Sequence, residues 1–376
     1  MINVGITGQH GFVGWHLYNT LALSKDQFEL VNFERHYFDD AEKLDTFVSS
    51  CDVIVHLAAM NRHPDLTVLF ETNVSTVEKL ILSLERTQSK AHVLFSSSTQ
   101  EERDNPYGKS KLLGREKLSE WAQKNQAQFT GLVIPNVFGP FGLPYYNSVV
   151  ATFCHQLTHD ETPVIDVDGV VKLIYVQELV AEIKSHICQV QDKTSFSRQV
   201  IVSPRYEISV SDILAKLVTF QQLYFVSGTI PALENVLDRN LFNTFRSFIN
   251  HKEYFPQKLI KHTDERGAFT EVIRLQVGGQ VSFSTTKPGI TRGNHFHTRK
   301  VERFTVIKGK ALIQLRKIGS DEQLDFYLDG NEPAYVDMPI WYTHNIKNIG
   351  EEELYTIFWI NEFYDSNDPD TYFETV

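Results

Sequence analysis

Residues 2–14 read INVGITGQHGFVG, and this stretch decides how the first part of the chain folds. The run from Ile2 to Thr7 is short and apolar, as expected for a buried strand. Gly8, Gly11 and Gly14 follow the run, and a helical pattern begins among them. Glycines at such a turn let the chain reverse tightly and let the helix pack close to the strand. The stretch therefore predicts the first strand, turn and helix of an α/β sheet.

The pattern of strand and helix repeats as far as Pro135. Expected strands lie at 28–33, 51–59, 92–97 and 129–135, and expected helices at 71–86 and 107–125. This alternation predicts a parallel, doubly wound, Rossmann-like sheet with ligand sites at the carboxyl ends of its strands. Residues 136–241 follow a looser pattern, with helices near 177–187 and 211–220, and we expect them to complete the first domain and to cover a cleft.

The character of the chain changes after Phe255 and Pro256. Short strand-like runs separated by Gly, Asp and Asn turns lie at 269–275, 280–286, 302–309, 310–318, 324–329, 334–339 and 354–360. Regularly spaced short strands predict an all-β barrel or sandwich. A chain of 376 residues is also long for one core. The sequence therefore predicts two domains, residues 1–245 and 256–376, joined by a linker at 246–255.

Composition excludes several classes of partner. The 36 basic and 47 acidic residues give a net charge of −11, which offers no electrostatic footprint for nucleic acid. The three cysteines show no CxxC pairing, so neither a disulfide framework nor a thiolate metal site is expected. The N-terminus lacks the pattern of a signal peptide, and no apolar run approaches the roughly 20 residues that cross a bilayer. We therefore expect a cytoplasmic protein without a membrane partner.

The glycine loop is the first candidate binding site. A helix that begins there directs free N–H groups and a partial positive charge at an anion, as in dinucleotide-binding turns. The expected cofactor contacts in the loop are Gly8, Gly11, Phe12, Val13 and Gly14. Glu34 and Arg35 follow the second strand, where a carboxylate favours NADH and an arginine favours NADPH. Arg35 makes NADPH the preferred prediction, and Glu34 leaves NADH open.

Tyr107 and Lys111 form the second candidate site. Their four-residue spacing puts both side chains on one face of the expected helix. A free tyrosine has a pKa of about 10, and a nearby ammonium would lower that pKa enough for acid–base work. The preceding strand ends in three serines that can hydrogen-bond a substrate carbonyl, namely Ser96, Ser97 and Ser98. The two sites together predict oxidoreduction with proton transfer.

These motifs resemble the extended short-chain dehydrogenase/reductase family in its sugar-nucleotide branch. The matching elements are TGQHGFVG, HLAA with Ala58 and Ala59, Asn73, the FSSS run, YGKSK and PNVFGP. The resemblance implies a catalytic set of Ser98, Tyr107 and Lys111, cofactor contacts at Ala58, Ala59, Tyr107 and Lys111, and substrate contacts at Asn136 and Lys172. Thr99 and Gln100 stand where the family's dehydratases carry Asp-Glu, which argues against dehydration. Only nine positions separate Ser98 from Tyr107, which implies a short loop and an open cleft.

The second domain carries a candidate metal site. In GNHFHTRKVE, His295 and His297 lie on the same side of one strand because side chains alternate along it. Glu302 can return from the next strand, and His344 follows in MPIWYTHNIKN. Three imidazoles and one carboxylate suit Zn²⁺, Ni²⁺, Fe²⁺ or Mn²⁺ better than Ca²⁺ or Mg²⁺. One divalent metal is therefore expected, with Zn²⁺ as the preferred ion.

The spacing of these ligands resembles the two cupin motifs, so the expected fold is an all-β cupin barrel. Trp341 stands where the second motif usually has glycine. Residues 262–274 resemble the opening segment of sugar-nucleotide 3,5-epimerase cupins, which implies substrate contacts at Arg266 and Glu271. No residue is assigned as the catalytic base of the cupin, for which the candidates are Tyr335, Tyr342 and Lys308.

A reductase followed by a cupin resembles the bifunctional UDP-sugar epimerase/reductases of capsular polysaccharide synthesis. The resemblance implies a homodimer acting on a UDP-linked 2-acetamido-2,6-dideoxy-4-keto-hexose. The cupin would epimerise C3 and the reductase would reduce C4 with NADPH, giving a UDP-6-deoxy-talosamine-type product on the route to UDP-N-acetyl-L-fucosamine. Two other hypotheses stay open: a reductase whose cupin serves only dimerisation and stability, and a non-enzymatic NADP(H)-binding sensor.

Overall fold

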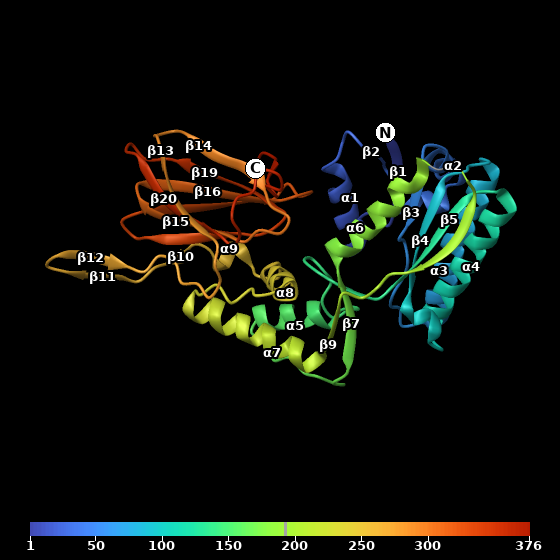
Figure 1. Ribbon diagram of the computed structural model, residues 1–376, viewed down its shortest axis with the longest axis horizontal. Helices are drawn as coiled ribbons and strands as arrows, with labels where there is room; N and C mark the ends of the chain where they lie inside the picture. The colour runs from blue at the N-terminus through green and yellow to red at the C-terminus, as the bar shows by residue number, and fades with distance from the viewer. Residues whose placement is uncertain (192–193) are drawn as a thin grey trace. The chain divides into compact units, whose positions relative to one another are not determined.

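The computed structural model describes residues 1–191 and 194–376, which form two compact units (Figure 1). The first unit comprises Met1–Val149 and Gly169–Ser209, and the second comprises Val150–Asp168 and Val210–Val376. The first unit is built on a parallel sheet with helices, and the second on antiparallel sheets. The predicted fold class is therefore confirmed.

The boundaries between the two compact units differ from the expected boundary near residues 245–256. Most of helix α5 (Val149–Thr158), and helices α7 (Val210–Gln221) and α8 (Val236–Arg246), belong with the β-rich unit. The rings of Phe220 on α7 and Phe242 on α8 pack edge-on at 5.4 Å, and the buried Arg246 of α8 donates to the Met338 carbonyl of the β-rich unit at 2.9 Å, which explains this grouping. The helices form a layer of the second unit, whereas the sequence pattern places them in the first.

The sheet of the first unit has six parallel strands in the order β2-β1-β3-β4-β5-β8. They are β1 (Ile2–Thr7), β2 (Phe28–Val31), β3 (Val53–His56), β4 (His92–Ser98), β5 (Gln128–Ile134) and β8 (Phe196–Ile201). Strand β1 lies between β2 and β3, so the strand order reverses beside it. A crevice for a ligand forms at such a switch point, at the carboxyl ends of the strands.

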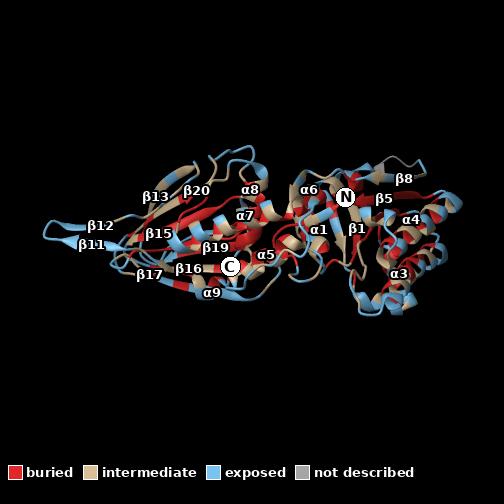
Figure 2. Cartoon of the chain, turned by 90° about the horizontal axis from the view of Figure 1, so that it is seen from below, coloured by how far each residue is buried: buried red, intermediate tan, exposed pale blue. Residues whose placement is uncertain are grey.

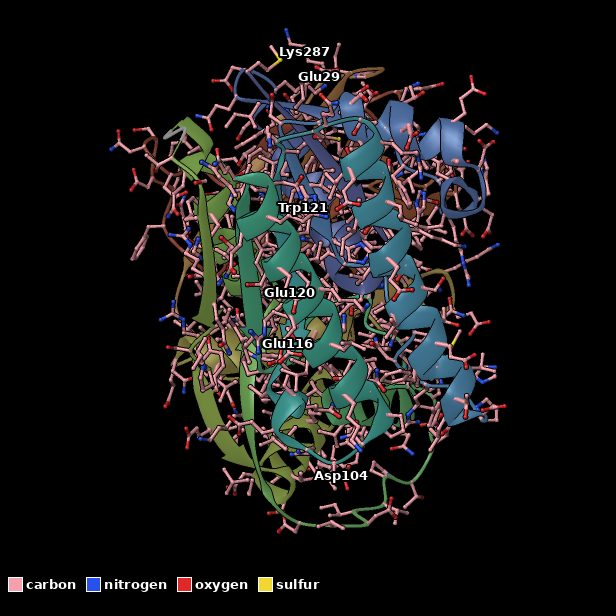
Figure 3. All side chains as sticks on the ribbon, turned by 90° about the vertical axis from the view of Figure 1, so that its right-hand side faces the viewer. Glu29, Asp104, Glu116, Glu120, Trp121 and Lys287 are labelled. Atoms are coloured by element: carbon pink, nitrogen blue, oxygen red, sulfur yellow. The ribbon has the colours of Figure 1, made fainter. Side chains whose placement is uncertain are left out.

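Helices cover both faces of this sheet: α1 (Phe12–Ala22), α2 (Ala41–Ser49), α3 (Leu66–Arg86), α4 (Pro106–Asn125) and α6 (Val176–Ile187). Apolar residues of α2, α3 and α4 pack in one core cluster, and those of α1 and α6 pack in another. On α4 the exposed Glu116 and Glu120 lie one turn apart, whereas Trp121 is buried (Figure 3). Helix α3 begins before the expected residue 71 because Asp65 accepts a hydrogen bond from the Thr67 N–H at 2.8 Å and caps it.

A small sheet and short helical segments complete the first unit. Strand β7 (Val170–Tyr175) pairs in parallel with β6 (Asn136–Phe138) and antiparallel with β9 (Tyr206–Ser209). Short 3-10 segments lie at Arg35–Asp39, Thr99–Glu102 and Cys188–Gln191. The sequence pattern does not predict the strands of this small sheet, which are short and pair across distant parts of the chain.

The second unit contains two five-stranded antiparallel sheets, β10-β18-β15-β20-β13 and β17-β16-β19-β14-β21. The strands are β10 (Gln257–Lys258), β13 (Gln280–Thr286), β14 (Thr291–Phe296), β15 (Glu302–Lys308), β16 (Lys310–Lys317), β17 (Gln323–Asp329), β18 (Ala334–Met338), β19 (Tyr342–Asn348), β20 (Leu354–Ile360) and β21 (Tyr372–Phe373). Apolar side chains from both sheets fill the space between them.

A two-stranded hairpin stands apart from these sheets. Strands β11 (Lys261–Asp264) and β12 (Gly267–Thr270) pair antiparallel, and almost every residue of the hairpin is exposed (Figure 2). The expected strand at 269–275 ends at Thr270, since no core lies beneath its apolar residues. Helix α9 (His251–Tyr254) precedes β10.

A buried ion pair holds the helical layer of the second unit to its first sheet. Arg303 on β15 and Asp337 on β18 are in register, and Arg303 Nε lies 2.7 Å from Asp337 Oδ1. Tyr224, in the π-helical segment Gln222–Val226, donates its hydroxyl to the other oxygen of Asp337 at 2.6 Å. The guanidinium also donates to the Gly228 carbonyl at 2.8 Å. Burial would raise the pKa of Asp337, but the Arg303 guanidinium holds that pKa below its usual value.

Substitution of Asp337 by alanine should strongly destabilise the second unit. The substitution leaves the Arg303 guanidinium buried without its counter-charge, which costs about 3–5 kcal/mol of unfolding free energy. Equilibrium urea unfolding measures this loss. The matched control is Glu332→Ala, which breaks the exposed pair with Lys258 and should leave the midpoint unchanged. Equal losses in the two variants would refute the assignment.

Candidate active site and candidate metal centre

The glycine loop joins β1 to α1 in the conformation that its sequence predicts. Gly8 has φ +79°, a left-handed value that disfavours any side chain. The Gly11 N–H donates to the Gly8 carbonyl at 2.9 Å. A Cβ atom on Gly14 would lie 2.1 Å from the same carbonyl oxygen, so only glycine allows α1 to approach this closely. The first turn of α1 is thereby held against the end of β1.

A pocket of about 470 Å³ opens at the carboxyl ends of β1, β2 and β3. The predicted cofactor residues that line it are Gly8, Gly11, Arg35, Ala58 and Ala59. Its other lining residues are Gln9, His10, Phe33, Phe38, Met60, Arg62, Thr72, Asn73, Thr76 and Tyr146. In the described part of the chain, the predicted contacts Phe12, Val13, Gly14, Tyr107 and Lys111 are not among the lining residues. The exposed Arg35 lines the pocket, and Glu34 does not.

Tyr107 and Lys111 lie on one face of α4. The Lys111 Nζ lies 5.8 Å from the centre of the Tyr107 ring and donates to the Ser96 carbonyl on β4 at 2.8 Å. Lys111 is buried, and the Phe95 ring lies 5.0 Å from its Nζ. The helix begins at the right point because Asn105 caps it by accepting from the Gly108 N–H at 2.8 Å.

The pKa values of this pair differ from the expectation. Burial lowers the pKa of Lys111 to about 7, although Glu101 acts in the opposite direction. Burial, together with the neighbouring Tyr146 phenol, raises the pKa of Tyr107 to about 12. The prediction that Lys111 lowers the Tyr107 pKa is therefore wrong for this structure. The ammonium is close to neutralisation at pH 7 and hydrogen-bonds the strand, so it offers little positive charge to the phenol.

The serine run and Asn73 form hydrogen bonds within the segments around Tyr107. The Ser98 hydroxyl accepts from the Gln100 N–H at 3.2 Å, within its own turn at the end of β4. The Ser97 hydroxyl donates to Glu101, which pairs with Arg115. Asn73 binds both the N–H and the carbonyl of Met60, at 2.6 and 2.9 Å, and donates to Ser110 at 3.1 Å. Asn73 therefore ties the pocket loop to the helix that carries Tyr107.

The two predicted substrate residues of the small sheet lie on its surface. Asn136 is exposed at the start of β6. Lys172 on β7 is exposed and lies 3.6 Å from the Glu207 carboxylate on β9, its register partner. Neither is among the described lining residues of the 470 Å³ pocket. Their roles toward substrate stay predictions.

The four predicted metal ligands meet in the second unit. One candidate ligand atom from each of His295, His297, Glu302 and His344 lies within 4.8 Å of the others. His295 on β14 and His344 on β19 are register partners, beside an irregularity in the pairing at Gly293. The Glu302 Oε2 atom lies 3.0 Å from His297 Nε2 and 3.3 Å from His344 Nε2. Sequence spacing and strand alternation thus bring the predicted set together.

The chemistry of the cluster fits a divalent cation. Burial, and then the neighbouring His344 and His297, lowers the pKa of His295 to about 4, so this imidazole is neutral and can donate a lone pair. The buried His344 Nε2 also faces the cluster, 3.3 Å from the Glu302 carboxylate. Three imidazoles and one carboxylate are a donor set typical of Zn²⁺ and related ions. The residues present therefore fit the predicted metal.

The loop before β19 adopts a strained conformation. Trp341, which replaces the usual glycine of the cupin motif, has φ +63°. This left-handed value is unfavourable for a bulky residue, and such strain persists only where the surroundings enforce it. Trp341 is buried, and its backbone N–H donates to the carbonyl of the candidate ligand residue His297 at 2.7 Å. The backbone geometry that glycine would allow is therefore retained.

The predicted substrate residues of the second unit pair with their own neighbours. Arg266 pairs with Asp264 at 2.5 Å on the exposed hairpin. Glu271, just after the hairpin, pairs with Arg274 at 2.5 Å. The roles of Arg266 and Glu271 toward substrate stay predictions.

The three candidate bases of the cupin also have other partners. The Tyr335 ring lies 3.7 Å from the Arg303 guanidinium, and Lys308 pairs with Glu352. The Tyr342 ring packs edge-on against His251. The Tyr342 carbonyl lies 3.2 Å from Nδ1 of the candidate ligand His344. These contacts single out none of the three as the base.

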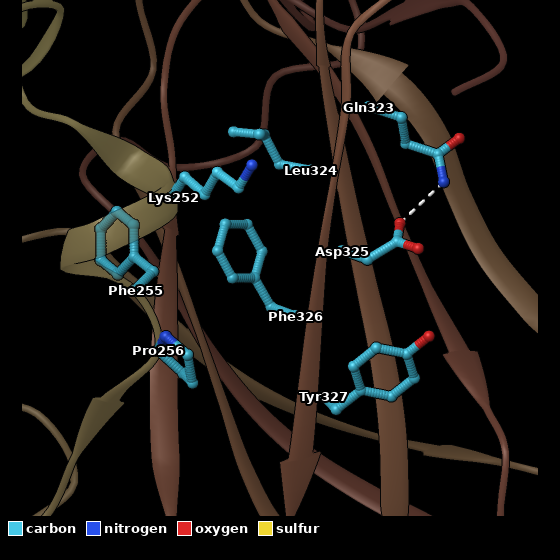
Figure 4. Close-up of a pocket in the computed structure, with 8 residues that line it drawn as sticks. All are labelled: Lys252, Phe255, Pro256, Gln323, Leu324, Asp325, Phe326 and Tyr327. Carbon is cyan, nitrogen blue, oxygen red and sulfur yellow. Dashed lines mark hydrogen bonds between the residues drawn. The ribbon is translucent and has the colours of Figure 1, made fainter.

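A second hollow of about 510 Å³ lies between α9 with its following residues and the edge strand β17 (Figure 4). It is lined by Lys252, Phe255, Pro256, Gln323, Leu324, Asp325, Phe326 and Tyr327. Gln323 donates to the Asp325 carboxylate at 2.7 Å along the strand. None of the predicted site residues is among the described lining residues of this hollow. The side chains that line it do not indicate a second catalytic or metal-binding site.

Two contributors to these sites carry no signal in the sequence pattern. Tyr146 lines the 470 Å³ pocket, and its hydroxyl accepts from the Asn61 N–H at 3.2 Å. The carbonyl of Asp370 accepts from the candidate ligand residue His297 at 2.5 Å. Both contacts join residues more than 70 positions apart, and no local pattern announces them.

Comparison with known proteins agrees with this architecture. Residues 4–193 match the NAD dependent epimerase/dehydratase family, and residues 262–372 match the polysaccharide biosynthesis C-terminal domain. The chain belongs to the NAD dependent epimerase/dehydratase family. Within the described residues, no helix is long and apolar enough to cross a membrane.

Two proteins resemble this chain over essentially its whole length, and a third resembles part of it. The chain is 33% identical to the UDP-2-acetamido-2,6-beta-L-arabino-hexul-4-ose reductase of Pseudomonas aeruginosa, over 99% of this chain and 98% of that protein. It is 36% identical to the crystal structure of the capsular polysaccharide assembling protein CapF from Staphylococcus aureus, with a TM-score of 0.63 and full coverage of both chains. The RMD structure from Pseudomonas aeruginosa, 19% identical with a TM-score of 0.52, covers 59% of this chain and 83% of its own and shares the fold.

Replacement of Lys111 by methionine should stabilise the first unit at neutral pH. The pKa of Lys111 is about 7 in the folded chain and near 10.5 when unfolded, so between these values the unfolded state binds more protons. The stability of the native chain therefore rises with pH across this window. Each tenfold change in proton affinity corresponds to about 1.4 kcal/mol, so the variant should gain at least about 1 kcal/mol near pH 7. Thermal unfolding at pH 6.5, 8 and 9.5 tests this, and a gain that fails to shrink with rising pH would contradict it.

Proposed function

We propose that this chain is a bifunctional UDP-sugar enzyme. The cupin unit epimerises C3 of a UDP-2-acetamido-2,6-dideoxy-4-keto-hexose, and the first unit reduces C4 with NADPH. The product is a UDP-6-deoxy-talosamine-type sugar on the route to UDP-N-acetyl-L-fucosamine. The observation that carries the proposal is the pairing of Tyr107 with the buried Lys111 in a fold whose glycine loop borders a 470 Å³ pocket. The Pseudomonas aeruginosa relative, a reductase of a UDP-linked hexul-4-ose, supports the same substrate class.

The raised pKa of Tyr107 suits reduction rather than oxidation. At neutral pH a phenol with a pKa of about 12 keeps its proton and can act as a general acid. When bound, NADPH supplies the hydride that adds to C4. The oxygen of the ketone then takes the proton from Tyr107, and Lys111, with a pKa of about 7, can return one. The burial of Lys111 excludes water and keeps this proton exchange local.

Arg35 supports NADPH over NADH. Its exposed guanidinium lines the pocket shortly after β2, where the 2′-position of the adenosine ribose lies in dinucleotide-binding folds. A guanidinium pairs well with a 2′-phosphate because it presents a fork of donors to the phosphate oxygens. Glu34, the competing carboxylate, is not among the described lining residues.

The histidine cluster supports the epimerase half. A C4 ketone acidifies the C3 proton, so a base can remove it and a proton can return on the other face. His295, His297, Glu302 and His344 would hold one divalent cation, preferably Zn²⁺, which would supply positive charge to stabilise negative charge that develops on the substrate. Epimerisation must precede reduction, because C3 loses its acidity once C4 is an alcohol. The base is not assigned.

Tyr107→Phe should abolish reduction while leaving cofactor binding intact. Loss of the acid should lower kcat by about 10²- to 10⁴-fold, since the phenyl ring keeps the packing but cannot donate a proton. Stopped-flow consumption of NADPH with the UDP-4-keto sugar measures kcat, and NADPH fluorescence measures binding. Tyr18→Phe, at a phenol on α1 outside the described pocket lining, is the control. A Tyr107→Phe enzyme with native kcat would refute the reductase assignment.

The double variant His295→Ala/His344→Ala should lose metal and C3 exchange together. In deuterated water with NADPH, the native chain should place deuterium at C3 of the reduced sugar, as mass spectrometry and NMR can show. The double variant should give no C3 deuterium, whereas Tyr107→Phe should exchange C3 without consuming NADPH. Reduction without exchange in the native chain would instead favour the alternative, a monofunctional reductase with a structural cupin.

A further inference from the structure

The C-terminal segment lies along the strands that carry the candidate metal ligands. Strand β21 pairs with β14, with Phe373 opposite His295 and Tyr372 opposite Phe296. The Glu374 N–H donates to the Asn294 carbonyl at 3.0 Å, which extends the contact. We call residues 369–374 the C-terminal strap. All of it belongs to the second unit.

The strap is fastened by the carboxylate of Asp370. One oxygen accepts from the Thr298 N–H at 3.0 Å and from the Thr298 hydroxyl at 2.6 Å. The other oxygen accepts from the N–H groups of Arg299 and Lys300, both at 3.1 Å. Asp370 is 2% exposed, so this carboxylate is buried and satisfied by the turn that directly follows His297. Charge-assisted bonds of this kind are stronger than neutral ones.

A lysine ammonium adds a second fastening point. Lys300, itself buried, donates its Nζ to the Pro369 carbonyl at 2.6 Å. Asp370 has φ +40°, a left-handed value that aspartate tolerates better than most residues. The residue therefore turns its carboxylate toward the turn and its carbonyl toward His297 at the same time.

The carbonyl of Asp370 determines which nitrogen of His297 is left for a cation. His297 Nδ1 lies 2.5 Å from this carbonyl oxygen. A carbonyl only accepts, so Nδ1 must carry the hydrogen and donate it. The other nitrogen, Nε2, lies 3.0 Å from Glu302 Oε2 in the cluster, and it would give up its hydrogen to bind a cation. A hydrogen bond to the far nitrogen fixes the tautomer and orientation of a metal-binding histidine.

We propose that Asp370 is a positioning residue for the metal centre: its carboxylate fastens the strap, and its carbonyl holds His297 with Nε2 directed at the other three ligands. The inference rests on the proposed metal function. The strap would then contribute to cation affinity although it lies outside the two motifs that carry the candidate ligands.

Titration of the metal-free full-length protein with Co²⁺, followed by visible absorption, tests the proposal. Asp370→Gly removes the carboxylate and tolerates the positive φ, so its Co²⁺ affinity should fall about 10- to 100-fold. Asp370→Asn keeps one acceptor oxygen and should give a smaller loss. Asp368→Asn is the matched control, because Asp368 is an exposed carboxylate directly before the strap that pairs with Arg299. Its affinity should equal that of the native chain.

Native affinity in Asp370→Gly would overturn the proposal, and so would an equal loss in Asp368→Asn. A native chain that binds no Co²⁺ would refute the metal function itself. In that case ¹⁵N-histidine NMR of the metal-free protein tests whether the strap holds His297. The His297→Asn variant assigns the His297 signal. The native spectrum should show a hydrogen on His297 Nδ1 that is hydrogen-bonded to the Asp370 carbonyl, and Asp370→Gly should lose the signal of this hydrogen bond. An unchanged Nδ1 hydrogen-bond signal in Asp370→Gly would overturn the strap independently.

Discussion

The Nζ of Lys111 donates to the Ser96 carbonyl, which joins α4 to β4 at the carboxyl end of the parallel sheet. The bond fixes α4 against the sheet, so Tyr107, one turn earlier, is held at the carboxyl end of the strands. Burial makes the ammonium costly, which is visible in its lowered pKa of about 7. Keeping such a costly group is expected if Lys111 has the proposed catalytic role, because active sites commonly exchange stability for function.

Sequence reasoning predicts those features that depend on local spacing. Gly8 and Gly14 are dictated by backbone geometry within one turn, and the four-residue spacing of Tyr107 and Lys111 is a property of any helix. The histidine ligands could be predicted for the same reason, since strand alternation brings His295 and His297 to one side. Local spacing along helices and strands thus predicts both the candidate Tyr107–Lys111 site and the candidate metal cluster.

Features set by distant contacts could not be predicted. The raised pKa of Tyr107 depends on burial, which a pattern of letters does not quantify. Tyr146 and Asp370 reach their partners across long loops. The sequence analysis does not predict helix α8, whose own buried residues include the polar Asp238, Asn240 and Arg246, so burial does not follow hydrophobicity along it. The assigned substrate residues Asn136 and Lys172 came from family resemblance, and the fold places both on exposed strand positions.

Strand β15 has consequences for how this family can evolve. Consecutive residues point to opposite sides of the strand, so Glu302 faces the histidines while Arg303 faces the helical layer and Asp337. Inserting or deleting a single residue at the start of β15 would exchange the two side chains and present a guanidinium to the three imidazoles. The surrounding loops can change length without this penalty. Related sequences should therefore keep β15 free of insertions and deletions, even where the exposed hairpin of β11 and β12 has lost all similarity in length.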